Sequence, residues 1–243
     1  MRILVTGHLG FIGTNLVKHL SQHDIVGLDL KNGHDILDCA LPADVGCVIH
    51  LAGIGGVRES IEDPAKYWRT NVEGTRRILE HYQDCRVLVA SSSSQYEPHL
   101  NPYAASKQTI EHIPHPDVCF MRFHTVYGPI PRSKMFFDKL INDTLEYVTQ
   151  HRRDFIHVDD MVRAIDLLMF SGYNGPIDIG TGSNVRISDI RKDLPIRHDT
   201  LGERQNTLAD TSKMNQLGFK ARYTVKMFLD EQGIENHLDD ECI

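Results

Sequence analysis

The N-terminus of the chain joins a short apolar run to three spaced glycines. Residues 2–6, Arg-Ile-Leu-Val-Thr, are an aliphatic and β-branched run of the kind that forms a buried strand. Gly7, Gly10 and Gly13 follow, and apolar residues then recur at helical spacing over residues 11–22. A strand that enters a helix through glycines at this spacing predicts the first βα unit of an α/β fold, with a tight turn between the two elements.

The same alternation continues through the first half of the chain. The short apolar runs that predict further strands are residues 24–29, 47–51, 86–90 and 118–123. Residues 64–82 form a long helical pattern that Pro64 opens, and a second helix carries Tyr103 and Lys107 and ends before Pro114. Because strands that alternate with helices build βαβ units, we expect a Rossmann-like, doubly wound parallel sheet.

The glycine turn also predicts a dinucleotide site. A helix N-terminus offers amide donors and the positive end of a dipole to a pyrophosphate. Asp29 ends the second predicted strand about 20 residues further on, where a carboxylate can accept hydrogen bonds from an adenosine ribose. A carboxylate there repels a 2′-phosphate, so NAD(H) is favoured over NADP(H). Glycines alone are a weak signal, and the alternative is a bare glycine turn beside a surface aspartate.

The pattern loosens beyond residue 128. The elements expected there are helices near 134–141 and at 159–170, strands near 155–158 and 176–179, and small C-terminal helices. We expect residues 1–128 to form an NAD-binding Rossmann domain, with 153–180 returning to it. Residues 129–152 and 181–243 are expected to form a small C-terminal substrate-binding cap over the carboxyl ends of the strands, where ligands bind in open α/β folds.

Composition argues against several classes of partner. The chain has 243 residues, of which 41% are hydrophobic, and a net charge of −7 without a basic run, so we expect neither nucleic-acid nor membrane binding. No apolar run is long enough to span a membrane, and the first strand leaves no room for a signal peptide. The 5 cysteines are scattered and the 14 histidines lack ligand spacing, so we expect a cytoplasmic protein without a metal.

Tyr103 and Lys107, in Tyr-Ala-Ala-Ser-Lys, lie one helical turn apart and indicate a catalytic acid–base pair. A phenol titrates near ~10 and is a poor base at neutral pH. The lysine projects from the same helix face, and its ammonium lowers the pKa of the phenol by stabilising phenolate. Such a phenolate can remove a proton from a sugar or alcohol hydroxyl while hydride leaves the carbon.

In its glycine turn and its Tyr103–Lys107 pair, the chain resembles the extended short-chain dehydrogenase/reductases. Among them it resembles the NAD-dependent nucleotide-sugar epimerase/dehydratase family, which includes the UDP-glucose 4-epimerases. The resemblance runs from Met1 to about Leu217. Beyond the glycine turn, its segments include His50-Leu-Ala-Gly53, Asn71-Val-Glu-Gly-Thr75, Ser91-Ser-Ser-Ser-Gln-Tyr96, Tyr127-Gly-Pro129, Arg153-Asp-Phe-Ile-His-Val-Asp-Asp160 and Gly180-Thr-Gly182.

The resemblance implies roles for individual residues. Ser92 would hydrogen-bond the reacting oxygen, Tyr103 would be the general base and then acid, and Lys107 would tune it and bind the nicotinamide ribose. Arg153 resembles the arginine that grips the nucleotide diphosphate, the alternative being a surface arginine, and Thr125 stands where the family has a substrate-contacting asparagine. The implied cofactor contacts are Gly7, Gly10, Phe11, Ile12, Gly13, Asp29, Asp35, Ile36, Leu51, Ala52, Gly53, Asn71, Tyr103 and Lys107.

Ser93 and Ser94 help to separate the reactions of the family. After the catalytic serine or threonine, its dehydratases carry an acidic pair, its decarboxylases a glutamate and its epimerase-reductases a cysteine. The serines are weak acids, so the simplest interpretation is 4-epimerisation of a nucleoside-diphosphate hexose by transient hydride transfer to bound NAD. A nucleotide-sugar dehydrogenase or reductase would need no extra acid either. A non-catalytic NAD-binding sensor is a third alternative, against which the retained Ser92, Tyr103 and Lys107 argue.

The resemblance also implies that the chain is compact, because relatives usually exceed 300 residues. In the family, the helix that carries the tyrosine and lysine commonly pairs with the preceding long helix across a dimer interface. Here proline at residue 114 shortens that helix. We therefore expect any homodimer to have a reduced interface.

Overall fold

The computed structural model describes residues 1–131, 133, 135–198 and 201–238. The chain folds into two compact units, which are described separately. The first comprises Met1–Phe123 and Val162–Ile177, and the second comprises His124–Met161 and Asp178–Ile243. This division differs from the sequence-based domain boundaries at residues 124–128, 153–161 and 178–180. In the first two segments, strand β6 (Thr125–Tyr127) pairs with β8 (Phe155–His157) in a separate sheet.

A six-stranded sheet with the order β2-β1-β3-β4-β5-β9 organises the first unit. Its strands are β1 (Arg2–Thr6), β2 (Asp24–Leu28), β3 (Cys47–His50), β4 (Arg86–Ser92), β5 (Val118–Phe123) and β9 (Gly175–Ile179). Strands β1 to β5 pair in parallel throughout. The order turns back at β1, where β2 lies on one side and β3 on the other, so the expected doubly wound Rossmann-like sheet is confirmed.

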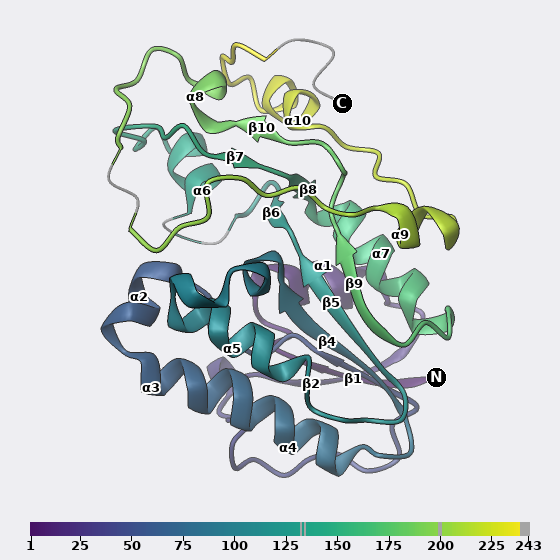
Figure 1. The fold of residues 1–243 in the computed structure, drawn as a ribbon. Helices are drawn as coiled ribbons and strands as arrows, with labels where there is room; N and C mark the ends of the chain where they lie inside the picture. The colour runs from purple at the N-terminus through teal and green to yellow at the C-terminus, as the bar shows by residue number, and fades with distance from the viewer. Residues whose placement is uncertain (132, 134, 199–200, 239–243) are drawn as a thin grey trace. The chain divides into compact units, whose positions relative to one another are not determined.

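Helices cover both faces of this sheet. Figure 1 shows α4 and α5 in front of the strands and α1 behind them. The helices are α1 (Phe11–His19), α2 (Val57–Glu62), α3 (Pro64–Tyr67), α4 (Gly74–His81), α5 (Pro102–Ile110) and α7 (Val158–Phe170), with short 3₁₀ turns η1 (Leu30–Asn32), η3 (Ser93–Tyr96) and η4 (Pro98–Leu100). Because both faces are covered, the central strands are apolar without alternation, and Ile3, Leu4 and Val5 are all completely buried.

The helix expected over residues 64–82 contains a π-helical turn, η2 (Trp68–Glu73), between α3 and α4. Asn71 lies in this turn and is buried. Its side chain accepts a hydrogen bond from Ile54 N at 2.9 Å and donates to Ile54 O and to Ser106 Oγ, each at 3.0 Å. The turn therefore joins the loop after β3 to helix α5, in keeping with the frequent occurrence of π turns at functional sites.

The second unit contains two small sheets and short helices. Strands β6 and β8 pair in parallel, and β7 (Arg152–Arg153) pairs with β10 (Val185–Arg186) antiparallel. Its helices include α6 (Phe136–Ile141), α8 (Ile187–Ile190), α9 (Ser212–Gln216) and α10 (Val225–Glu231). Residue 134, where the first of these was expected to begin, lies outside the described residues. An aromatic core forms around fully buried Tyr127, whose ring stacks on Phe137 with 4.8 Å between centroids.

Asp154 organises the loops of the second unit. The residue is completely buried, and its carboxylate accepts hydrogen bonds from Thr181 N and Oγ1 at 2.8 Å, from Gly182 N at 2.9 Å and from Ala209 N at 3.0 Å. Four donors satisfy the charge, so Asp154 fixes the glycine-containing loop after β9. Among the helices of the described residues, none has the length and apolar composition needed to cross a bilayer.

Candidate functional site

The glycine turn after β1 has no room for a side chain at Gly7 or at Gly13. Gly7 has φ +72°, and a Cβ there would lie 2.7 Å from Ala52 N. A Cβ on Gly13 would lie 2.2 Å from Gly7 O, which is a backbone atom that cannot turn aside. The first turn of α1 begins at Phe11, so the amides of Phe11, Ile12 and Gly13 have no acceptor within the helix. This turn has the form of an anion cradle.

Asp29 lies directly after β2 and is bound to the glycine turn. One carboxylate oxygen accepts Leu9 N at 3.0 Å, and the other accepts Lys31 N at 2.9 Å as the cap of η1. Lys31 Nζ in turn donates to Leu9 O at 2.8 Å. Each carboxylate oxygen keeps a second lone pair, so the oriented carboxylate can accept further hydrogen bonds.

Asp35 and Ile36 are held in the loop after η1. Asp35 Oδ1 accepts Leu37 N at 3.0 Å, and Arg77 donates to Ile36 O at 2.8 Å. The side chain of Ile36 is buried against Gly74, where an added Cβ would lie 2.6 Å from Ile36 Cδ1. Helix α4 thus fixes this loop relative to the sheet.

A buried hydrogen-bond chain under the Leu51–Gly53 segment was not predicted from the sequence. Ala52 N donates to Thr6 Oγ1 at 3.1 Å, and Thr6 Oγ1 shares a hydrogen bond of 2.7 Å with His50 Nδ1. The other ring nitrogen, His50 Nε2, shares a hydrogen bond of 3.1 Å with Thr75 Oγ1. Burial, with a further contribution from the positive charge of Lys107, lowers the pKa of His50 to about 3. His50 is therefore neutral and orients the Ala52 backbone.

Lys107 joins helix α5 to strand β4 in the first unit. Its Nζ donates to Ala90 O at 2.7 Å, two residues before Ser92, and the side chain is buried. A Cβ on Gly53 would lie 3.6 Å from this Nζ and 3.0 Å from Asn71 Oδ1. Burial lowers the pKa of Lys107 to about 8, and Glu111 opposes the shift. The lysine thus stays mostly protonated at neutral pH.

Tyr103 and Ser92 come from the two elements that Lys107 connects. Helix α5 starts at Pro102 because Asn101 Oδ1 caps it by accepting Ala104 N at 2.8 Å. Tyr103 is therefore in the first turn, and its ring meets Tyr67 edge-on with 6.2 Å between centroids. Ser92 ends β4, is buried, and accepts Ser94 N at 3.1 Å as the cap of η3.

Thr125 and Arg153 belong to the second unit. Thr125 is the first residue of β6, and its backbone N donates to Asp154 O at 3.0 Å. Arg153 donates to His151 Nδ1 at 3.1 Å and lies 3.7 Å from the Glu203 carboxylate. The sequence predicted neither His151 nor Glu203; spacing could have indicated His151, two residues before Arg153, whereas nothing local links Arg153 to Glu203.

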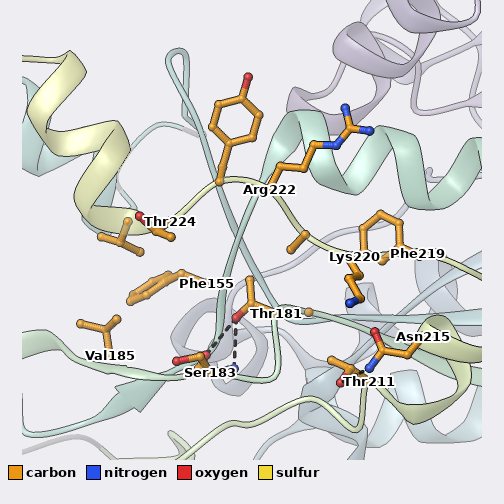
Figure 2. Close-up of a pocket in the computed structure, with 14 residues that line it drawn as sticks. Phe155, Thr181, Ser183, Val185, Thr211, Asn215, Phe219, Lys220, Arg222 and Thr224 are labelled. Carbon is orange, nitrogen blue, oxygen red and sulfur yellow. Dashed lines mark hydrogen bonds between the residues drawn. The ribbon is translucent and has the colours of Figure 1, made fainter. Parts of the chain in front are cut away.

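The second unit also contains a pocket of about 260 Å³ (Figure 2). Phe155 and Val185 provide apolar walls, and Thr181 and Ser183 are joined by two hydrogen bonds, of 3.0 and 3.2 Å. Lys220 also lines the pocket, and in Figure 2 its side chain extends in the opposite direction from that of Arg222. No residue predicted from the sequence as a ligand contact lines this pocket.

The Rossmann-like sheet, the glycine turn bound by Asp29, and helix α5 with Tyr103 and Lys107 define a class of protein that comparison with known proteins identifies. The chain belongs to the NAD dependent epimerase/dehydratase family, whose model matches residues 3–180. It is 29% identical to the uncharacterized UDP-glucose epimerase YtcB of Bacillus subtilis, in an alignment that covers 89% of this chain and 92% of that protein.

Two solved structures share this architecture. MoeE5 in complex with UDP-glucose and NAD is 32% identical with a TM-score of 0.82, and the match covers 96% of this chain and 97% of that one. The UDP-glucuronic acid 4-epimerase of Bacillus cereus, in complex with UDP-glucuronic acid and NAD, is 28% identical with a TM-score of 0.85, covering 96% and 98%.

Proposed function

We propose that the protein is an NAD-dependent nucleotide-sugar 4-epimerase that inverts C4 of a nucleoside-diphosphate hexose. Supporting the proposal are the family membership, the resemblance to proteins described as UDP-sugar epimerases, and the hydrogen bond by which Lys107 joins α5, which carries Tyr103, to β4, which ends at Ser92. The observation that favours epimerisation over elimination of water is the pair Ser93 and Ser94, which places hydroxyls where, as the resemblance implies, the dehydratases of the family carry an acidic pair.

The residues of the first unit fit the cofactor. Gly7 and Gly13 allow the turn to pack closely on backbone that any side chain would strike, and the amides at the start of α1, which have no acceptor within the helix, suit a pyrophosphate. Asp29 would accept the adenosine ribose hydroxyls, and its negative charge disfavours a 2′-phosphate. Leu51, Ala52 and Gly53 would supply backbone along the cofactor, held from beneath by the His50 chain. Lys107 would bind the nicotinamide-side ribose.

Bound NAD supplies the reversible oxidation of the sugar's alcohol carbon. Tyr103 takes the proton of the C4 hydroxyl and later returns it, acting as base and then as acid. Ser92 donates a hydrogen bond to the same oxygen and stabilises the charge that develops on it. Lys107 favours the phenolate form of Tyr103 electrostatically, which requires that the lysine be protonated. Arg153 and Thr125 are proposed contacts of the nucleotide sugar, with a bidentate guanidinium suited to a diphosphate.

Epimerisation is distinguished from the alternatives by following both sugar and cofactor. Incubation with UDP-glucose and UDP-glucuronic acid should produce the C4 epimer, detected by proton NMR, without accumulation of the reduced-nicotinamide absorbance. Steady accumulation of that absorbance with added NAD would instead identify a dehydrogenase. A protein that binds NAD and leaves every sugar unchanged would be a sensor, and the proposal would be wrong.

Tyr103→Phe tests the assigned base directly. Because only the phenolic oxygen is lost, NAD binding should be unchanged while turnover falls by at least about 10²-fold. Tyr67→Phe is the matched control, since its ring packs against Tyr103 and its hydroxyl donates to Gly55 O at 3.2 Å. A Tyr103→Phe variant that keeps most of its rate would show that another group is the base.

A further inference from the structure

The carboxylate of Glu111, at the C-terminal end of α5, contacts strands β4 and β5 and, through Arg122, the 3₁₀ turn η3. Ser91 Oγ, at the end of β4, donates to Glu111 Oε1 at 2.5 Å. Arg122 on β5 donates from Nε to both carboxylate oxygens at 3.1 Å and from a terminal nitrogen to Oε2 at 2.7 Å. Its other terminal nitrogen donates to the Tyr96 hydroxyl at 2.9 Å, and its guanidinium lies 4.9 Å from the centre of that ring in η3.

The Glu111–Arg122 pair at the centre of this network is largely shielded from solvent, and its geometry is specific. The Glu111 side chain is 6% exposed and that of Arg122 is 19% exposed, so solvent screens the pair only weakly. The fork of the guanidinium matches the carboxylate in a bidentate arrangement, and burial makes loss of either partner costly. Ser91 precedes Ser92, whereas Glu111 follows Lys107 by four residues and is the C-cap of α5. The network therefore connects the serine strand to the helix of the tyrosine and lysine.

We propose that Glu111, anchored by Arg122, is a positioning residue that fixes the Ser92 end of β4 against helix α5 and so sets the alignment of Ser92 with Tyr103 and Lys107. The inference rests on the proposed function, because it assigns Glu111 to the alignment of the reacting groups. Ordinary core packing would tolerate a neutral group of the same shape. A positioning carboxylate does not, since both of its oxygens accept hydrogen bonds from Ser91 and Arg122, whereas a glutamine offers only one acceptor oxygen.

Glu111 also acts on Lys107 through space. The groups that face Lys107 are the Ala90 carbonyl from β4, Gly53 with Asn71 of η2 behind it, neutral His50 from β3, and Tyr103 and Glu111 from its own helix. Of these, Glu111 is the carboxylate. It raises the pKa of Lys107 against the larger lowering by burial. Removal of its charge should therefore let Lys107 lose its proton at lower pH.

Two variants, Glu111→Gln and Ser91→Ala, distinguish the effect of Glu111 on alignment from the effect of its charge on Lys107. Glu111→Gln keeps the shape but removes the charge, and we expect kcat to fall by about 10- to 100-fold with little change in sugar KM, the scale seen when reacting groups are misplaced. The Lys107 titration, followed by NMR of ¹³C-lysine-labelled, nucleotide-free protein and assigned with Lys107→Met, should move to lower pH. Ser91→Ala keeps the ion pair, so kcat should fall while the Lys107 titration stays in place.

Glu80→Gln is the control, because Glu80 is a solvent-exposed carboxylate 3.9 Å from Arg76 on α4. It should change neither kcat nor the titration. If Glu111→Gln does not fold, as judged by circular dichroism, Ser91→Ala decides the alignment. Wild-type kcat in Ser91→Ala, or an unmoved Lys107 titration in folded Glu111→Gln, would overturn the inference. Inactive wild-type protein would refute the proposed function instead, and the titration in nucleotide-free protein would still test Glu111.

Discussion

Replacing Lys107 by methionine should make the protein more stable and inactive. The ammonium is buried, and its pKa falls from the ordinary 10.5 to about 8 because burial penalises the charge. At about 1.36 kcal/mol per pKa unit, the charged lysine costs the fold about 3 kcal/mol. Methionine has similar length and no charge, so it removes this cost. It also removes the 2.7 Å hydrogen bond to Ala90 O, a loss of about 1 kcal/mol.

The pH dependence of this difference has a definite sign. Below pH 8 the wild-type lysine is charged in both folded and unfolded protein, so the cost is fully present and the variant is more stable by about 2 kcal/mol. From pH 8 to 10.5 the folded protein binds fewer protons than the unfolded chain, and wild-type stability rises with pH. At pH 10 only about 1 kcal/mol of the burial cost remains, which offsets the lost hydrogen bond, so the two proteins should have nearly equal stability.

Urea unfolding of nucleotide-free protein at pH 7 and pH 10 measures both values. Lys66→Met, at an exposed lysine on α3, controls for general effects of the substitution and should change neither. If Lys107→Met is destabilising at pH 7, or differs from wild type equally at both pH values, the burial argument is refuted. A stabilised but inactive variant would show that the lysine is retained for chemistry at the expense of stability.

Two further substitutions test the cofactor site. Gly13→Ala would place a Cβ 2.2 Å from Gly7 O, so we expect destabilisation of about 1–3 kcal/mol or more and loss of NAD binding, measured by thermal unfolding and calorimetry. The control is Gly46→Ala, whose Cβ meets the Met1 side chain and an oxygen at 3.7 Å and should be tolerated. A Gly13→Ala variant with normal NAD affinity would contradict the steric argument. Asp29→Ala removes the acceptor of Leu9 N and the proposed ribose contact, so NAD affinity should fall far more than sugar affinity, and an equal loss of both in titrations would refute the ribose assignment.

Local sequence predicted the strands well because their signals are local. The apolar runs at residues 2–6 and 118–123 form β1 and β5 with the expected bounds, since a strand buried on both faces must be continuously apolar. Helix α2 (Val57–Glu62) was missed because six residues after a glycine loop show too little periodicity. The π turn was missed because Asn71 sets it through contacts with Ile54 and Ser106, 17 and 35 residues away.

The residues of the candidate site also divide into those that local sequence predicts and those that it does not. Spacing placed Tyr103 and Lys107 on one helix and the glycines in one turn, because both motifs are short. The supporting groups could not be predicted, since each partner comes from a different strand or helix: His50 meets Thr6 across 44 residues, and Ser91 meets Glu111 across 20. Only tertiary structure brings these polar side chains together, so their pairing depends on the whole sheet.

The π turn at Trp68–Glu73 makes the position of Asn71 depend on the number of residues in this helix. One residue advances an α-helix by about 100° around its axis. A chain that lost a single residue here could close the bulge into regular α-helical hydrogen bonding and gain a smoother helix. The same deletion would swing Asn71 away from Ile54 and Ser106, uncoupling the loop after β3 from α5. Sequence variation at this helix is thus expected to favour substitutions over single-residue deletions.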